Sequence, residues 1–89
     1  MVGKDLIMSK IFTVTTNEEP VELIEKIRRR FSNDSNISFN GNEDNGAFSG
    51  RGIFGKYHIK DDLITITIEK KPFYIPWIII EEEIKKFFS

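Results

Sequence analysis

The sequence contains no cysteine, which removes several kinds of chemistry at once. Without thiols the chain cannot form disulfides, hold a metal through thiolates or use a cysteine nucleophile. This composition is typical of a reducing compartment. Residues 1–8 carry an acid, Asp5, and lack the apolar segment of a signal peptide. We therefore expect a cytoplasmic protein.

Long hydrophobic runs are missing as well. The longest apolar stretch, residues 74–80, is interrupted by Pro76. A membrane-spanning helix needs about 20 consecutive apolar residues. We therefore expect no membrane span.

An excess of either charge is also absent, because 13 Lys and Arg residues nearly balance 14 Asp and Glu residues and leave a net charge of −1. Domains that bind nucleic acid usually carry a basic excess or a basic face, since neutralising phosphates drives their binding. The basic cluster at residues 28–30 has two interpretations: a patch for phosphate or an acidic partner, or the solvated last turn of a helix. Nucleic acid is therefore not an expected partner.

What the chain does contain suits one small globular domain. Of its 89 residues, 39% are hydrophobic and 30% are charged, which is the range of folded rather than disordered proteins. This length suffices for a two-layer core without disulfides or a metal. We predict one α+β domain over residues 10–89, preceded by a loose leader over residues 1–9, with Met1 and Met8 both open as the start residue.

The order of secondary structure follows from periodicity and turn signals. β-branched and aromatic residues predict four strands, at 11–16, 37–39, 47–60 and 63–71. Apolar residues three and four positions apart predict a helix that ends near Phe31 and a second helix at 77–88. The prediction is a two-layer β-α-β-β-β-α domain, with a four-stranded, mainly antiparallel, curved sheet and both helices on one face.

The predicted third strand, residues 47–60, is irregular. Its large apolar residues cannot share one face under strict alternation, because two of them are even-numbered and three are odd-numbered. These residues are Phe48, Ile53, Phe54, Tyr57 and Ile59. We therefore expect a bulge or bend among the glycines of this segment, which are Gly50, Gly52 and Gly55.

No catalytic, metal or cofactor site is recognisable. The one histidine, His58, has no nucleophile or second histidine at a useful spacing. The acidic runs at 61–62 and 81–83 point adjacent carboxylates in different directions. The glycines at 50–55 are followed by a strand, not by the helix N-terminus that a phosphate loop needs. We therefore expect that the protein is not an enzyme and holds no metal or cofactor.

Residues 51–57, Arg-Gly-Ile-Phe-Gly-Lys-Tyr, invite comparison with the RNA-binding strand signature of RRM domains. The segment has Ile53 where that signature has an aromatic residue and Gly55 where it has a stacking Phe. RNA binding is therefore the third functional hypothesis, after the two that follow.

Aromatic residues are frequent, with eight Phe, two Tyr and one Trp. Two helices cover only one face of a sheet, and the third strand offers apolar residues to both faces, so a surplus remains beyond the core. The first hypothesis is a non-catalytic binding or accessory protein with an apolar cleft between the sheet and the C-terminal helix, or an apolar surface, that takes a hydrophobic ligand or a lipid-like surface. Phe54, Tyr57 and Trp77 are the predicted lining residues. The second hypothesis is a homodimer that pairs through the exposed sheet face or an edge strand.

Residues 52–88 begin with Gly-Ile-Phe-Gly-Lys-Tyr-His-Ile, followed by an acidic turn and the segment Leu-Ile-Thr-Ile-Thr-Ile. A Lys-Pro connector then leads to an Ile-Pro-Trp helix that ends in Ile-Lys-Lys-Phe-Phe. The segment Phe-Asn-Gly, at 39–41, precedes this pattern. In element order over residues 10–88, this pattern resembles a small bacterial family, the polyhydroxyalkanoic acid system proteins. The histidine-containing segment before the first helix of that family has no counterpart at 15–17. The resemblance implies an association with storage-polyester granules, and it carries over no catalytic residues.

Overall fold

The computed structural model describes residues 9–88, which form five strands and two helices. In chain order these are β1 (Lys10–Thr15), α1 (Pro20–Phe31), β2 (Ile37–Gly41), β3 (Asn45–Gly50), β4 (Ile53–Lys60), β5 (Leu63–Lys70) and α2 (Trp77–Phe88). The predicted leader, residues 1–9, lies outside the described residues except for Ser9.

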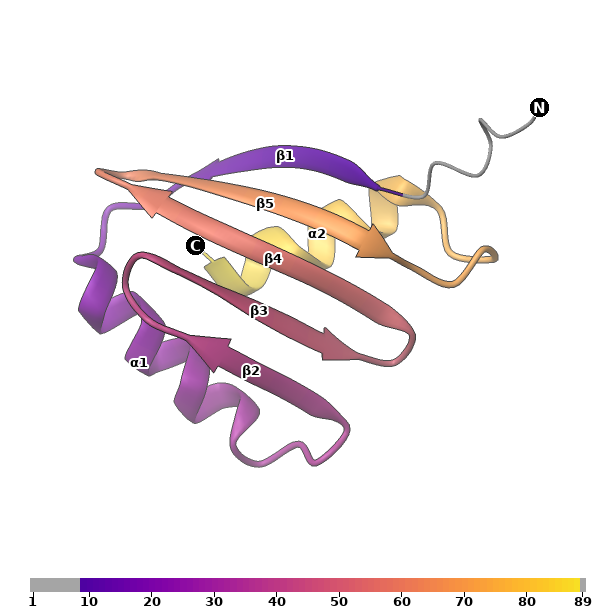
Figure 1. Cartoon of the computed structure of the whole chain (residues 1–89), viewed down its shortest axis with the longest axis horizontal. Coiled ribbons are helices and arrows are strands. Elements are labelled where there is room, and N and C mark those ends of the chain that lie inside the picture. The colour runs from indigo at the N-terminus through magenta and orange to yellow at the C-terminus, as the bar shows by residue number, and fades with distance from the viewer. Residues whose placement is uncertain (1–8, 89) are drawn as a thin grey trace.

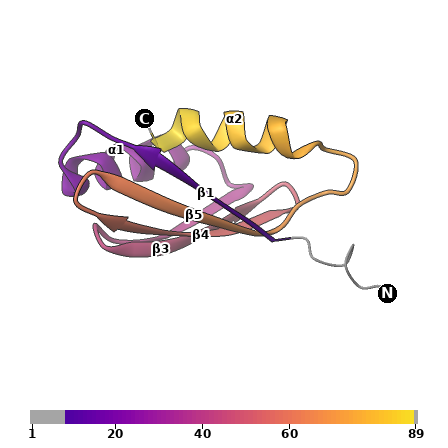
Figure 2. The ribbon, with the colours of Figure 1, turned by 90° about the horizontal axis from the view of Figure 1, so that it is seen from above.

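The strands form one antiparallel sheet in the order β1-β5-β4-β3-β2 (Figure 1). Both helices lie on the same face of this sheet, as Figure 2 shows from the side. The fold is therefore α+β with one covered face. The predicted four strands are wrong, because the described chain has five, in the order β-α-β-β-β-β-α.

The fifth strand arises because the predicted strand at 47–60 is a hairpin. Arg51 and Gly52 form its turn, with φ of 55° and 85°, so both residues are left-handed. A two-residue turn with both residues left-handed has a backbone twist that matches the right-handed twist of the flanking strands. Sequence reasoning missed this turn because an arginine rarely takes the left-handed conformation, which Asn, Asp and Gly favour.

The hairpin explains the irregular apolar pattern. After the reversal Phe48 of β3 lies opposite Gly55 of β4, so Phe48 and Tyr57 share the covered face despite their different parity. The irregularity expected among the glycines is present between Phe54 and Gly55, where the register of β4 against β5 shifts.

The core lies between the covered face and the two helices. Ile64, Ile66 and Ile68 alternate along β5 and are completely buried at its centre. The helices contribute the buried stripes Leu23, Ile24 and Ile27 from α1, and Ile80, Ile84 and Phe88 from α2. Each such side chain contributes about 1.5–3 kcal/mol of transfer free energy when it leaves water. These contacts position α2 across the sheet.

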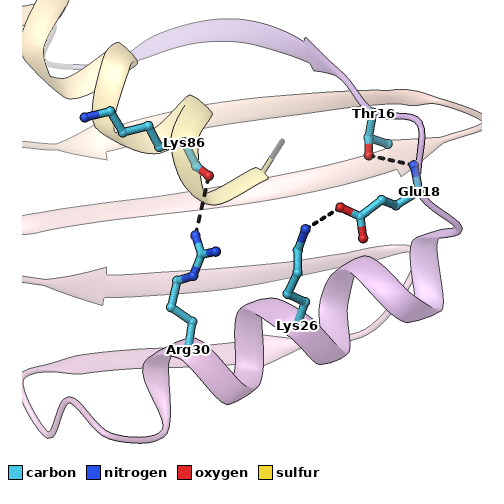
Figure 3. A network of polar contacts seen from close by, with 5 residues as sticks. All are labelled: Thr16, Glu18, Lys26, Arg30 and Lys86. Carbon is cyan, nitrogen blue, oxygen red and sulfur yellow. Dashed lines mark hydrogen bonds and ion pairs between the residues drawn. The ribbon is translucent and has the colours of Figure 1, made fainter.

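Polar contacts hold α1 to its neighbours (Figure 3). Lys26 forms an ion pair with Glu18, and the Glu18 backbone N–H donates to Thr16 Oγ1 at 3.1 Å. Arg30 donates to the Lys86 carbonyl oxygen of α2 at 3.5 Å, and Arg28 to the Gly41 carbonyl oxygen of β2 at 2.6 Å. Two of the three arginines at 28–30 therefore bind backbone carbonyls of neighbouring elements.

The face of the sheet away from the helices is polar at its centre. Its central register pairs are Thr13 with Thr65, His58 with Thr65, and Lys56 with Thr67. Alternation of apolar and polar residues is typical of an antiparallel sheet with one solvated face. Neither of the two described helices has the length and apolar character needed to cross a bilayer.

Candidate functional site

An apolar cleft of about 360 Å³ lies between α2 and one end of the sheet. This end is formed by the start of β2, the end of β3, the β3–β4 turn and the start of β4. The lining is mostly aliphatic and aromatic, and its residues are Phe31, Ile37, Phe48, Ser49, Gly50, Arg51, Ile53, Ile75, Ile79, Ile80, Glu83, Ile84 and Phe87. It is the most apolar hollow described for residues 9–88.

The local sequence explains why this space is not filled. Helix α2 presents a wide apolar surface here, from Ile79 to Phe87, but the opposing strand ends in Ser49 and Gly50. A Cβ atom on Gly50 would lie 2.7 Å from the carbonyl oxygen of Asn36. The neighbouring backbone therefore excludes a side chain at this position.

The charged groups of the cleft are at its rim and already have partners. Arg51 forms an ion pair with Asp34 at 2.9 Å, and Glu83 approaches Lys86 at 3.6 Å. No other charged side chain is among the lining residues. A buried charge on a ligand would therefore find no free counterion inside, whereas an apolar group loses nothing by entering.

The three residues predicted to line a cleft do not surround this one. Phe54 is half-buried beside Ser49 on the uncovered face of the sheet. Trp77 is half-buried at the start of α2, with the Lys10 and Lys71 ammonium groups 5.7 Å and 5.3 Å from its ring centroid. Tyr57 is buried in the core, with 3% of its surface exposed. The structure does not bring these residues together, and their role in binding stays a prediction.

Tyr57 has a packing role in the described structure. Its ring stacks on Phe39 at 5.6 Å with an interplanar angle of 3°, and its hydroxyl donates to the Asn42 carbonyl oxygen at 2.7 Å. Burial raises the pKa of Tyr57 to about 12, with Arg28 opposing the shift and Glu43 adding to it. The hydroxyl therefore keeps its proton and its hydrogen bond at neutral pH.

Sequence reasoning missed the residues that line this cleft because most of its apolar lining is isoleucine rather than aromatic. One signal was present: α2 carries Ile78, Ile79 and Ile80 in succession, which is more than one buried stripe requires. Ile80 is buried in the core, Ile79 lines the cleft and Ile78 is exposed. A helix whose apolar surface is broader than its core contacts require therefore indicates a cleft beside it.

A second hollow, of about 530 Å³, lies at the opposite end of the sheet and is acidic. Six carboxylates line it, those of Glu18, Glu19, Glu43, Asp44, Asp61 and Asp62. Across the described chain, no group of three or more His, Asp or Glu side chains is placed to hold a metal ion. We treat this end as an acidic surface.

Comparison of the chain with protein-family models, with curated proteins and with solved structures gives no match. The resemblance to the polyhydroxyalkanoic acid system proteins therefore stays a prediction, and the function has to be argued from the cleft.

Proposed function

We propose that the protein binds an apolar ligand, without catalysis, in the cleft between α2 and the β3–β4 end of the sheet. The observation that carries this proposal is a space of about 360 Å³ with an almost wholly apolar lining. Ligand pockets in proteins have volumes of roughly 300–1,000 Å³ and are mostly apolar.

The size of the cleft limits the ligand. At about 30 Å³ for each water-sized group, the volume accommodates on the order of ten non-hydrogen atoms. A medium-length acyl chain or a small aromatic compound fits this limit. Any polar head group would lie at the rim, near Arg51.

The test uses an environment-sensitive fluorescent acyl probe and two variants on neighbouring helix positions. Ile79 lines the cleft and is 45% exposed, whereas Ile78 is 64% exposed and is not among the lining residues. Ile79→Trp narrows the cleft, so we expect the affinity for the probe to fall by about tenfold or more, as for the loss of a well-packed apolar contact. Ile78→Trp adds the same ring outside the cleft and should leave the affinity unchanged.

Two outcomes contradict this proposal. One is a wild-type chain that takes up no apolar probe, and the other is an equal loss of affinity in both tryptophan variants. Backbone amide shifts on titration with the probe provide a second readout, and we expect the largest shifts at Ile37, Ile53 and Ile79.

A homodimer that pairs through the sheet is the less favoured function. The centre of the uncovered face carries Thr13, Thr65, Lys56 and His58. Its apolar side chains are those of Ile11, Phe54 and Leu63, which lie toward the strand ends, so two copies would bury no continuous apolar surface. Sedimentation at micromolar concentration tests the homodimer hypothesis, and a strictly monomeric protein would exclude it.

A further inference from the structure

Exposed apolar side chains gather at the β5–α2 connector and the first turn of α2. Phe73 is 87% exposed, Tyr74 72%, Ile78 64% and Ile79 45%. These four, which we call the apolar tip, are four of the seven large apolar side chains exposed among residues 9–88. They fall within seven consecutive positions, whereas the other three are scattered over β1, α1 and β5.

The connector holds the tip in a defined shape. Pro72 and Pro76 restrict the backbone on either side. The Ile75 backbone N–H donates to the Pro72 carbonyl oxygen at 3.2 Å, and the Lys71 ammonium donates to the carbonyl oxygens of Pro72 and Ile75 at 3.1 Å and 2.7 Å. The Phe73 and Tyr74 rings contact each other edge to face at 5.6 Å, away from the core. Their exposure is thus built into the connector.

Charge is distributed unevenly between the two ends of the molecule. Lys70 and Lys71 precede the tip and are separated from Phe73 by Pro72. Among the neighbouring acids, Glu69 and Glu81 are in ion pairs, with Lys56 at 3.3 Å and with Lys10 at 2.8 Å, and Glu82 is exposed.

The acidic hollow with its six carboxylates lies at the other end of the sheet. Figure 1 shows the connector at the right end and the β4–β5 turn with the start of α1 at the left end. An anionic surface therefore attracts the tip end and repels the other.

We propose that the apolar tip docks on the surface of an anionic lipid bilayer, with the Phe73 and Tyr74 rings in the interface and Lys70 at the level of the phosphates. Aromatic side chains prefer this region, and lysines beside them pair with anionic head groups. Glu82, exposed one turn beyond Ile78, ends the apolar surface and limits the depth of insertion.

The shape of the tip favours a bilayer over a second protein chain. A stable protein interface buries about 800 Å² on each partner. The tip offers four side chains on a projecting turn, which is too small for such an interface but sufficient for insertion between head groups.

The tip and the cleft share a border. Ile75 and Ile79 line the cleft, and Ile79 also belongs to the tip. Docking brings the cleft next to the acyl region, so an apolar ligand passes between bilayer and cleft with little exposure to water. This last step rests on the proposed function, whereas docking itself does not.

The test is co-sedimentation of the full chain with phosphatidylcholine vesicles that contain phosphatidylglycerol, and with vesicles of phosphatidylcholine alone. We expect binding to the anionic vesicles and weaker binding to the neutral ones. The double variant Phe73→Ser/Tyr74→Ser should bind anionic vesicles about tenfold more weakly or worse, because the inserted apolar surface is lost. The control Val21→Ser/Leu63→Ser removes two exposed apolar side chains, 54% and 42% exposed, from the other end and should bind like wild type.

The proposal is overturned if wild type does not sediment with anionic vesicles, or if both double variants lose binding equally. It is also overturned if the wild-type chain dimerises without vesicles and only the tip variant is monomeric, since the tip would then pair two copies. Probe binding without vesicles separates the two proposals: a chain that binds vesicles but no probe retains docking and loses the cleft, and the reverse result retains the cleft alone.

Discussion

The covered face of the sheet is closely packed at one end and hollow at the other, although α2 lies over both ends. At the packed end the Tyr57 ring lies between Phe39 and Phe88, with ring centroids 5.6 Å away on each side. At the cleft end the same helix faces a space of about 360 Å³. The difference shows that the same helix closes the core where Phe88 meets the Tyr57 ring and borders a cleft where its isoleucines face the end of β3.

Glycines contribute to both ends in different ways. At the packed end Gly41 and Gly46 are register partners, and the Tyr57 side chain occupies the space where their Cβ atoms would lie. At the cleft end a Cβ atom on Gly50 would lie 2.7 Å from the Asn36 carbonyl oxygen and 3.0 Å from Ile37 Cγ1. The space beside Gly41 and Gly46 is therefore filled by a ring, whereas the space beside Gly50 is filled by the Asn36 backbone and an aliphatic side chain.

The largest expected effect is at the packed end. In Gly46→Ala the new methyl group would lie 2.6 Å from Tyr57 Cε2 and 2.6 Å from the Gly41 Cα atom. Both neighbours would have to move, so we expect a loss of about 3 kcal/mol in the free energy of unfolding, measured by urea denaturation. Ser49→Ala, on the same strand beside the cleft, is the control and should change stability by less than about 0.5 kcal/mol. Equal losses of stability in the two variants would contradict close packing around Gly46.

The second prediction concerns pH. An unfolded tyrosine ionises near pH 10, whereas burial raises the pKa of Tyr57 to about 12. The folded state binds this proton more tightly, so the contribution of the Tyr57 hydroxyl to the free energy of unfolding is fully present below pH 10 and is lost as pH rises from 10 to 12. We expect a loss of about 2 kcal/mol over that range. Denaturation of wild type and Tyr57→Phe as a function of pH isolates this contribution, and identical slopes would contradict it.

One substitution made at both ends of β4 compares them directly. Ile59 is 5% exposed at the packed end, whereas Ile53 is half-buried and lines the cleft. Ile59→Phe should lower the free energy of unfolding by about 1–3 kcal/mol, because the side chain is buried and its core neighbours would have to shift to accept a ring. Ile53→Phe should stay within about 1 kcal/mol of wild type and reduce probe uptake. The comparison fails if Ile53→Phe is the more destabilising change.

The smallest effects concern charge. Asp34→Asn at the cleft end breaks the ion pair with Arg51 but keeps the oxygen that accepts from the Asn36 backbone N–H. We expect a loss of about 0.5 kcal/mol. Asp61→Asn at the other end removes one of six neighbouring carboxylates, and asparagine suits the left-handed conformation there. We expect the free energy of unfolding to rise by a similar or smaller amount, and this gain should disappear at high salt. The same sign for both variants would contradict the proposed charge asymmetry.

Local patterns predicted much of the fold. The alternation of Ile64, Ile66 and Ile68 predicted a strand with one covered face, which the structure confirms. The predicted helix at 77–88 is confirmed as α2, because its apolar spacing and Pro76 at its start are properties of neighbouring residues. The strand at 47–60 was predicted wrongly, since the left-handed Arg51 that divides it has no local signature.

The sequence by itself determined the fold class, the two helices and the covered face, because the periodicity of apolar residues sets which side of each element leaves water. The tertiary structure decided which residues line the cleft. Tyr57 was predicted to line a cleft but is buried in the core, while Ile53 and Ile79, from elements far apart in the chain, line the cleft that exists. A cavity forms where side chains of distant elements fail to meet, and no pattern within a single element records that distance.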